Sequence, residues 1–139
     1  MAKIKLDFNN IPQHIGIIMD GNRRWARARG KPAFEGHRRG FDITPSLSRA
    51  CRDFGIHTLT FWVFSTENWD RPKEEIAFLM KKLEEFVGVH LKEAKKSGVR
   101  IIHLGRKDRI PSSLANKIIR AEEETKEKKK FVLNIALDY

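Results

Sequence analysis

The chain has 139 residues, a length that suits one compact domain over residues 1–139 and is short for two. A hydrophobic fraction of 40% with nine Phe excludes intrinsic disorder, and the single cysteine, Cys51, excludes a disulfide framework and predicts a reducing, cytoplasmic compartment. The 28 Lys and Arg against 18 Asp and Glu give a net charge of +10, which predicts an anionic partner: nucleic acid, a phosphorylated metabolite or an acidic membrane surface.

The first third of the chain contains a strand pattern followed by a helix pattern. The apolar run His14–Met19 predicts a buried strand, because it ends at the turn signal Asp20-Gly21-Asn22. Apolar residues three or four apart then predict a helix over residues 36–53, closed by Gly55. Pro45 lies inside this stretch and is expected either to start the main helix or to kink it.

The rest of the chain continues this alternation. β-Branched and aromatic residues at 58–64 predict the second strand, and a helical pattern opened by Pro72 runs to Ser97. A third strand is predicted at 99–104, a helix opened by Pro111 follows, and a fourth strand is predicted at 131–136. Strands that alternate with helices in this way indicate an α/β fold with a parallel sheet flanked by helices.

Ligands of open parallel sheets bind at the carboxyl ends of the strands, and two of these ends are rich in polar residues. Residues 20–25, Asp-Gly-Asn-Arg-Arg-Trp, follow the first strand, and residues 65–72 follow the second, which should pair with the first. The ends at 105–108 and 137–139 look ordinary by comparison. The sequence therefore predicts a site between the first two strands.

The loop after the first strand has the parts of an anion site. Gly21 allows the backbone to approach a ligand closely, and N–H groups from Asn22 onward can bind phosphate. Arg23 and Arg24 can add charge-assisted contacts, and Asp20 beside phosphate oxygens can hold Mg²⁺. The simpler interpretation, in which Asp20 only caps a helix and the arginines cover surface, stays open from these residues alone.

The loop after the second strand strengthens the site hypothesis. It follows a hydrophobic strand and carries a dense polar set: Ser65, Glu67, Asn68, Trp69 and Arg71. His37, at the start of the first long helix, falls near the same strand ends. Cations at the mouth and apolar side chains behind them suit a phosphorylated molecule with an apolar tail.

Three segments together resemble the cis-prenyltransferase family. They are His-Ile-Gly-Ile-Ile-Met-Asp-Gly-Asn-Arg-Arg-Trp at 14–25, Glu-Gly-His-Arg-Arg-Gly at 35–40 and Phe-Ser-Thr-Glu-Asn-Trp-Asp-Arg-Pro at 64–72. The run Leu-Asn-Ile-Ala at 133–136 is also similar to that family's next strand. The resemblance covers nearly the whole chain, in the right order.

The resemblance implies condensation of isopentenyl diphosphate with an allylic diphosphate, farnesyl diphosphate being the expected one, with Mg²⁺ as cofactor. It implies that Asp20 is the essential carboxylate and metal ligand, and that Asn68 is the position assigned to proton removal. A neutral amide is a poor base, so positioning is the more physical role for Asn68. The helices from Gly36 and from Pro72 would line a hydrophobic tunnel. The implied substrate-binding residues are Gly21, Asn22, Arg23, Arg24, Trp25, His37, Ser65, Thr66, Glu67, Trp69 and Arg71.

Two departures from the family pattern change these expectations. Ala33 stands where members often carry a phosphate-binding arginine, with Lys31 as the nearest replacement. The chain reads Ala-Leu-Asp-Tyr at 136–139, where the family continues into an arginine and serine motif that binds isopentenyl diphosphate. We therefore expect the N-terminal part of the fold, catalytically incomplete alone, as a homodimer or with a partner that supplies the remainder, and with peripheral membrane association as one use of its charge.

Other classes of function remain open at this point. The chain fits a non-catalytic or split subunit of a prenyltransferase, which a separate C-terminal half would complete. A basic nucleic-acid-binding module is a second alternative, although the cations are spread rather than confined to one recognition helix, so we expect no nucleic-acid partner. A phosphatase with Asp20 as nucleophile is a third, but it needs a second carboxylate where Asn22 stands.

Overall fold

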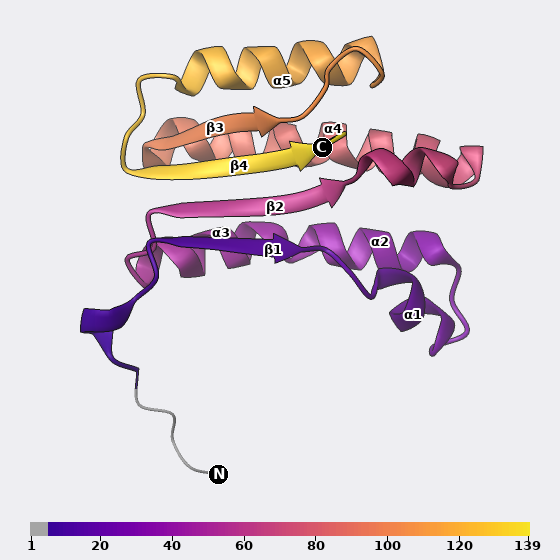
Figure 1. Cartoon of the computed structure of the whole chain (residues 1–139), viewed down its shortest axis with the longest axis horizontal. Coiled ribbons are helices and arrows are strands. Elements are labelled where there is room, and N and C mark those ends of the chain that lie inside the picture. The colour runs from indigo at the N-terminus through magenta and orange to yellow at the C-terminus, as the bar shows by residue number, and fades with distance from the viewer. Residues whose placement is uncertain (1–5) are drawn as a thin grey trace.

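The computed structural model describes residues 6–139, so residues 1–5 of the predicted domain lie outside the described ones (Figure 1). All four predicted strands form, and they make one parallel sheet in the order β1-β2-β4-β3. The predicted α/β class and the pairing of the first two strands are confirmed. The strands are β1 (His14–Ile18), β2 (Thr58–Phe64), β3 (Val99–Leu104) and β4 (Phe131–Leu137).

The helix predicted over residues 36–53 is two helices. The break falls at Ile43, and Pro45 lies in the first turn of the second helix, where its missing N–H costs nothing. The Thr44 hydroxyl donates to the Phe41 carbonyl at 2.8 Å across the junction. The helices are α1 (Asn22–Arg27), α2 (Ala33–Asp42), α3 (Thr44–Asp53), α4 (Lys73–Ser97) and α5 (Ser112–Thr125), with 3-10 helices at Phe8–Asn10 and Thr66–Asp70.

α2, α3 and α4 pack behind the sheet in the view of Figure 1, and α5 lies beside β3 at the edge of the sheet. Strand residues on that face are the large buried ones, such as Leu59, Phe61 and Leu133, whereas the alternate residues are half-buried or exposed. The sequence predicts a buried strand at β1, but β1 is an edge strand with alternating exposure. The reason is that, within residues 6–139, the second face of the sheet carries no helix. None of the helices in this part of the chain is long and apolar enough to cross a bilayer.

Buried histidines make the stability of this fold sensitive to acid. His90 on α4 is 3% exposed, lies against Phe86 and faces the Thr44 hydroxyl at 3.2 Å. Burial lowers the pKa of His90 to about 4, and burial also lowers the pKa values of His37 and His103. Each of these groups therefore takes up a proton more readily in the unfolded chain than in the folded chain.

We expect His90 to reduce the free energy of unfolding by about 2 kcal/mol between pH 7 and pH 5. Its stabilising contribution is complete above the unfolded pKa near 6.5 and is lost as the pH falls toward the folded value of about 4. Urea unfolding at the two pH values measures the difference. His90→Gln keeps a polar group near Thr44 but does not titrate, so its pH dependence should be smaller by about 2 kcal/mol; equal pH dependence would contradict the assignment.

Candidate functional site

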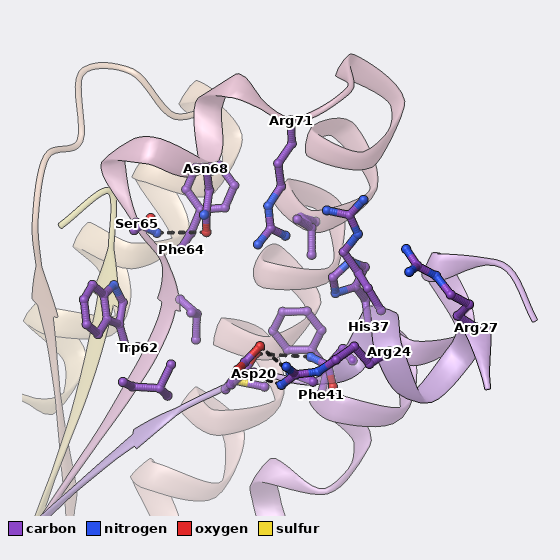
Figure 2. Close-up of a pocket in the computed structure, with 17 residues that line it drawn as sticks. Asp20, Arg24, Arg27, His37, Phe41, Trp62, Phe64, Ser65, Asn68 and Arg71 are labelled. Atoms are coloured by element: carbon purple, nitrogen blue, oxygen red, sulfur yellow. Dashed lines mark hydrogen bonds and ion pairs between the residues drawn. The ribbon is translucent and has the colours of Figure 1, made fainter. Parts of the chain in front are cut away.

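A cavity of about 510 Å³ lies at the carboxyl ends of β1 and β2 (Figure 2). Polar residues from both predicted loops line it, which supports the interpretation of the strand ends. Nine of the predicted site residues line it: Asp20, Gly21, Asn22, Arg23, Arg24, His37, Ser65, Asn68 and Arg71. The other lining residues, mostly apolar, are Ile18, Met19, Arg27, Phe41, Trp62, Val63, Phe64 and Leu79.

The first loop turns into the cavity at Gly21, whose φ of +83° is in the left-handed region that favours glycine. α1 then begins at Asn22 and packs on α2 so closely that a Cβ on Gly36 would lie 2.0 Å from the Asn22 carbonyl oxygen. α1 has only six residues, so its dipole is short. The positive charge of the cavity therefore comes mainly from arginine side chains.

Asp20 is the only carboxylate among the lining residues. Its side chain is 74% exposed, accepts from the Gly21 N–H and pairs with the Arg24 guanidinium at 3.0 Å. Over residues 6–139 no cluster of three or more His, Cys, Asp or Glu side chains is placed to hold a metal ion. Mg²⁺ typically binds one or two carboxylates together with substrate phosphates and water. The donor set therefore fits Mg²⁺ when a phosphorylated ligand supplies the other oxygens.

His37, Arg71 and Glu75 form a largely buried, hydrogen-bonded triad beside the cavity. His37 Nε2 lies 3.0 Å from Glu75 Oε1, and Arg71 Nη1 lies 3.2 Å from the same oxygen. Burial lowers the pKa of His37, while its hydrogen bond to Glu75 opposes that shift. The lowered pKa favours neutral His37, which can donate its Nε2–H to Glu75 Oε1. Glu75 is not among the site residues predicted from the sequence; its position four residues after Arg71 was the available signal.

Asn68 is engaged in its own turn. The Ser65 backbone N–H donates to Asn68 Oδ1 at 3.1 Å, and the Asn68 N–H donates to the Ser65 carbonyl at 3.1 Å. Figure 2 shows the Ser65–Asn68 bond at the rim of the cavity. The Asn68 amide oxygen therefore accepts a hydrogen bond that stabilises the conformation of the loop.

Four predicted site residues lie outside the cavity lining: Trp25, Thr66, Glu67 and Trp69. Trp25 instead stacks under the Arg29 guanidinium, 4.5 Å from the ring centroid, with the Lys31 ammonium at 5.8 Å. Lys31, the nearest replacement for an arginine at position 33, is likewise not among the lining residues. Contact between these residues and a substrate stays a prediction.

Arg27 was missed by sequence reasoning and lines the cavity. It comes four residues after Arg23 and three after Arg24 on α1, so helical spacing alone places the three on neighbouring positions. The last strand end lies outside the cavity lining, as predicted for an end that looks ordinary, but its Asp138 is 1% exposed and contacts Trp69 and Arg109. That contact joins segments 69 residues apart, which no local pattern indicates.

Comparisons with known proteins agree on one family. The family model described as "Putative undecaprenyl diphosphate synthase" matches residues 18–139. Isoprenyl transferases from Bacillus cereus and Aquifex aeolicus are 43% and 42% identical over 129 residues, which are 93% of this chain and 50% and 56% of those proteins. The crystal structure of lavandulyl diphosphate synthase from Lavandula x intermedia in complex with dimethylallyl diphosphate has a TM-score of 0.87 and 33% identity, covering 91% of this chain and 55% of that one. The chain spans about half the length of the curated relatives it matches.

Proposed function

Because the chain belongs to the undecaprenyl diphosphate synthase family, we propose that its cavity binds an allylic diphosphate within a cis-prenyltransferase that extends this substrate with isopentenyl diphosphate. The observation that carries the proposal is the composition of the cavity lining. Arg23, Arg24, Arg27 and Arg71 supply positive charge, and apolar side chains such as Phe41 and Leu79 supply hydrocarbon surface. That arrangement suits a diphosphate joined to a hydrocarbon tail.

The arginines would hold the diphosphate by charge-assisted hydrogen bonds. Arg27, which lines the cavity, is our candidate to compensate for Ala33, which stands where family members often carry an arginine. The Gly21 turn allows close approach of the backbone, and His37 orients Glu75 and Arg71 beside the cavity. Farnesyl diphosphate is our expected allylic substrate, with its tail along Phe41 and Leu79 between α2 and α4.

In the proposed reaction the allylic C–O bond breaks and inorganic pyrophosphate leaves. A C–C bond forms to the terminal alkene carbon of isopentenyl diphosphate, which then loses a proton from C2 to an oxygen of the released pyrophosphate. The arginines stabilise the charge that develops on the leaving diphosphate, and the apolar wall keeps water from the cationic carbon. Asn68 positions the reacting groups, because its amide oxygen accepts from the Ser65 N–H and an amide is a weak base.

Mg²⁺ is our proposed cofactor, with Asp20 as its protein ligand beside the diphosphate oxygens. Bound there, the ion would neutralise charge on the leaving group. We propose the whole activity for the chain together with the remainder of the fold that its relatives contain, as a homodimer or with a partner. A cytoplasmic location and peripheral attachment to anionic membranes, supported by the net charge of +10, belong to the same proposal.

Diphosphate binding tests the proposed function directly. We expect calorimetry at low salt to show binding of dimethylallyl diphosphate to the wild-type chain, and Arg27→Ala to weaken it about fivefold, as expected for loss of one exposed charge-assisted contact. Arg29→Ala is the matched control, since this neighbouring arginine stacks on Trp25 outside the cavity. Equal losses in both variants would show general charge attraction and contradict the assignment of Arg27.

Two further ligands separate the alternatives in the same assay. Dimethylallyl alcohol lacks the diphosphate and should not bind, whereas inorganic pyrophosphate should bind more weakly than dimethylallyl diphosphate. Single-stranded RNA that binds more tightly than the diphosphate, with steep salt dependence, would favour the nucleic-acid module instead. Diphosphate binding without turnover when a C-terminal half is supplied would favour a non-catalytic subunit.

A further inference from the structure

Asp138 is a buried carboxylate that the proposed chemistry does not use. Its side chain is fully buried just after β4, and it receives the Arg109 guanidinium in a two-point contact, with Nε to Oδ2 at 2.9 Å and Nη2 to Oδ1. The Trp69 indole Nε1 donates to Oδ1 at 2.9 Å. The hydrogen bonds from Arg109 and from Trp69 lower the pKa of Asp138, although burial opposes the shift. Charges this deeply buried persist only where they are paired and hydrogen-bonded, as here.

The backbone of Asp138 is held as firmly as its side chain. Its N–H donates to the Phe64 carbonyl at 2.8 Å, and its carbonyl accepts from the Arg106 N–H at 3.0 Å. Its φ is +55°, a left-handed conformation that costs free energy for a residue with a side chain. Gly105 passes so close that a Cβ there would lie 2.2 Å from the Leu137 carbonyl oxygen. The backbone of Asp138 is therefore strained, and its carboxylate lies between the segment that contains Trp69 and the loop that contains Arg109.

Trp69 connects this carboxylate to the cavity. It lies in the 3-10 helix Thr66–Asp70, and its ring packs edge-on against Phe64 with centroids 5.0 Å apart. The cavity residue Asn68 immediately precedes it, and Arg71 follows two residues later. The Arg109 guanidinium also lies over the Trp69 ring, 5.7 Å from its centroid. The segment that presents Ser65, Asn68 and Arg71 is thus tied at its midpoint to the ends of β4 and β3.

We propose that Asp138 is a positioning residue that holds the Ser65–Arg71 segment in the conformation that binds the diphosphate, acting through Trp69 and with Arg109 as its counter-ion. The inference rests on the proposed function of the cavity. It explains why Trp69, which the sequence places in the site, has its indole N–H directed to Asp138 rather than to the cavity. Asp138 itself touches no reacting group.

Asp138→Asn is the informative variant, because asparagine has the same shape and tolerates a left-handed backbone. The variant removes the negative charge that pairs with Arg109, and its amide NH₂ group puts a donor where one carboxylate oxygen accepted a hydrogen bond. We expect amide hydrogen exchange in residues 66–71 to accelerate about tenfold, the Trp69 indole NMR signal to shift, and the affinity for dimethylallyl diphosphate to fall about tenfold. Arg109→Lys keeps a positive charge near Asp138, so it should lose less affinity for dimethylallyl diphosphate than Arg109→Ala.

Arg106→Ala is the matched control, since its side chain pairs with Asp108 in the same loop and is exposed. It should leave exchange in 66–71 and diphosphate affinity unchanged. Unchanged exchange in Asp138→Asn would overturn the inference, as would faster exchange with wild-type affinity for the diphosphate. Failure of the wild-type chain to bind the diphosphate would instead refute the proposed function, and the exchange and indole measurements would still decide whether Asp138 anchors the segment.

Discussion

Asp20→Ala is expected to abolish the gain in affinity for dimethylallyl diphosphate that Mg²⁺ provides, a loss on the order of 100-fold in the presence of the ion. The physical reason is that Asp20 is the single carboxylate lining the cavity, so no other lining side chain can share the ion with the diphosphate. Calorimetry with Mg²⁺ and with EDTA separates the two conditions.

Without Mg²⁺, in the presence of EDTA, the same variant should not lose affinity for the diphosphate. Asp20 pairs with Arg24 at 3.0 Å and repels a diphosphate, so its removal frees a guanidinium and should leave metal-free binding equal or up to about fivefold tighter. Asp108→Ala is the control, because this exposed aspartate pairs with Arg106 in another loop. A loss of similar size with and without Mg²⁺ would show that Asp20 acts on the loop conformation rather than through the ion.

Gly36→Ala is expected to have the largest effect on stability, a loss of about 3 kcal/mol in the free energy of unfolding. The new Cβ would lie 2.0 Å from the Asn22 carbonyl oxygen and 2.7 Å from its carbonyl carbon. These are backbone atoms of the cavity loop, which cannot move aside as the end of a flexible side chain can. α1 must shift away from α2, and the affinity for the diphosphate should fall with it.

Gly88→Ala on α4 is the matched helical control. Its nearest contact is the flexible Lys117 ammonium at 3.6 Å, so alanine should stabilise the helix by about 0.5–1 kcal/mol. Urea denaturation measures both variants. If Gly36→Ala proved as stable as Gly88→Ala, the close packing of α1 on α2 described above would be wrong.

Most of the candidate site could be predicted from the sequence because its parts are local. The Asp-Gly-Asn-Arg-Arg segment and the Ser65–Arg71 segment each lie within a few residues of a strand end, and parallel strands bring such ends to one edge. Glu75 and Asp138, which were missed, are related to the predicted residues only through space. Glu75 binds His37 across 38 positions, and Asp138 binds Trp69 across 69.

The directions in which side chains leave α1 explain why Arg27 lines the cavity and Trp25 does not. Trp25 and Arg27 are two positions apart on α1, and neighbours at that spacing point to different sides of a helix. Arg27 therefore lines the cavity while Trp25 stacks with Arg29 outside it. Only the packing of α1 on α2 through Gly36 decides which side faces the cavity.

The sequence by itself determined the α/β class, the four strands, the family and the gathering of polar and positively charged residues at two strand ends, where the cavity lies. These features follow from apolar periodicity, turn residues and contiguous motifs, all of which are short-range. The tertiary structure alone decided the strand order β1-β2-β4-β3, the edge position of β1, the buried triad around Glu75 and the anchoring of Trp69 by Asp138. The reason is that β4 inserts between β2 and β3, which brings residue 138 beside residue 69 without any signal in the intervening chain.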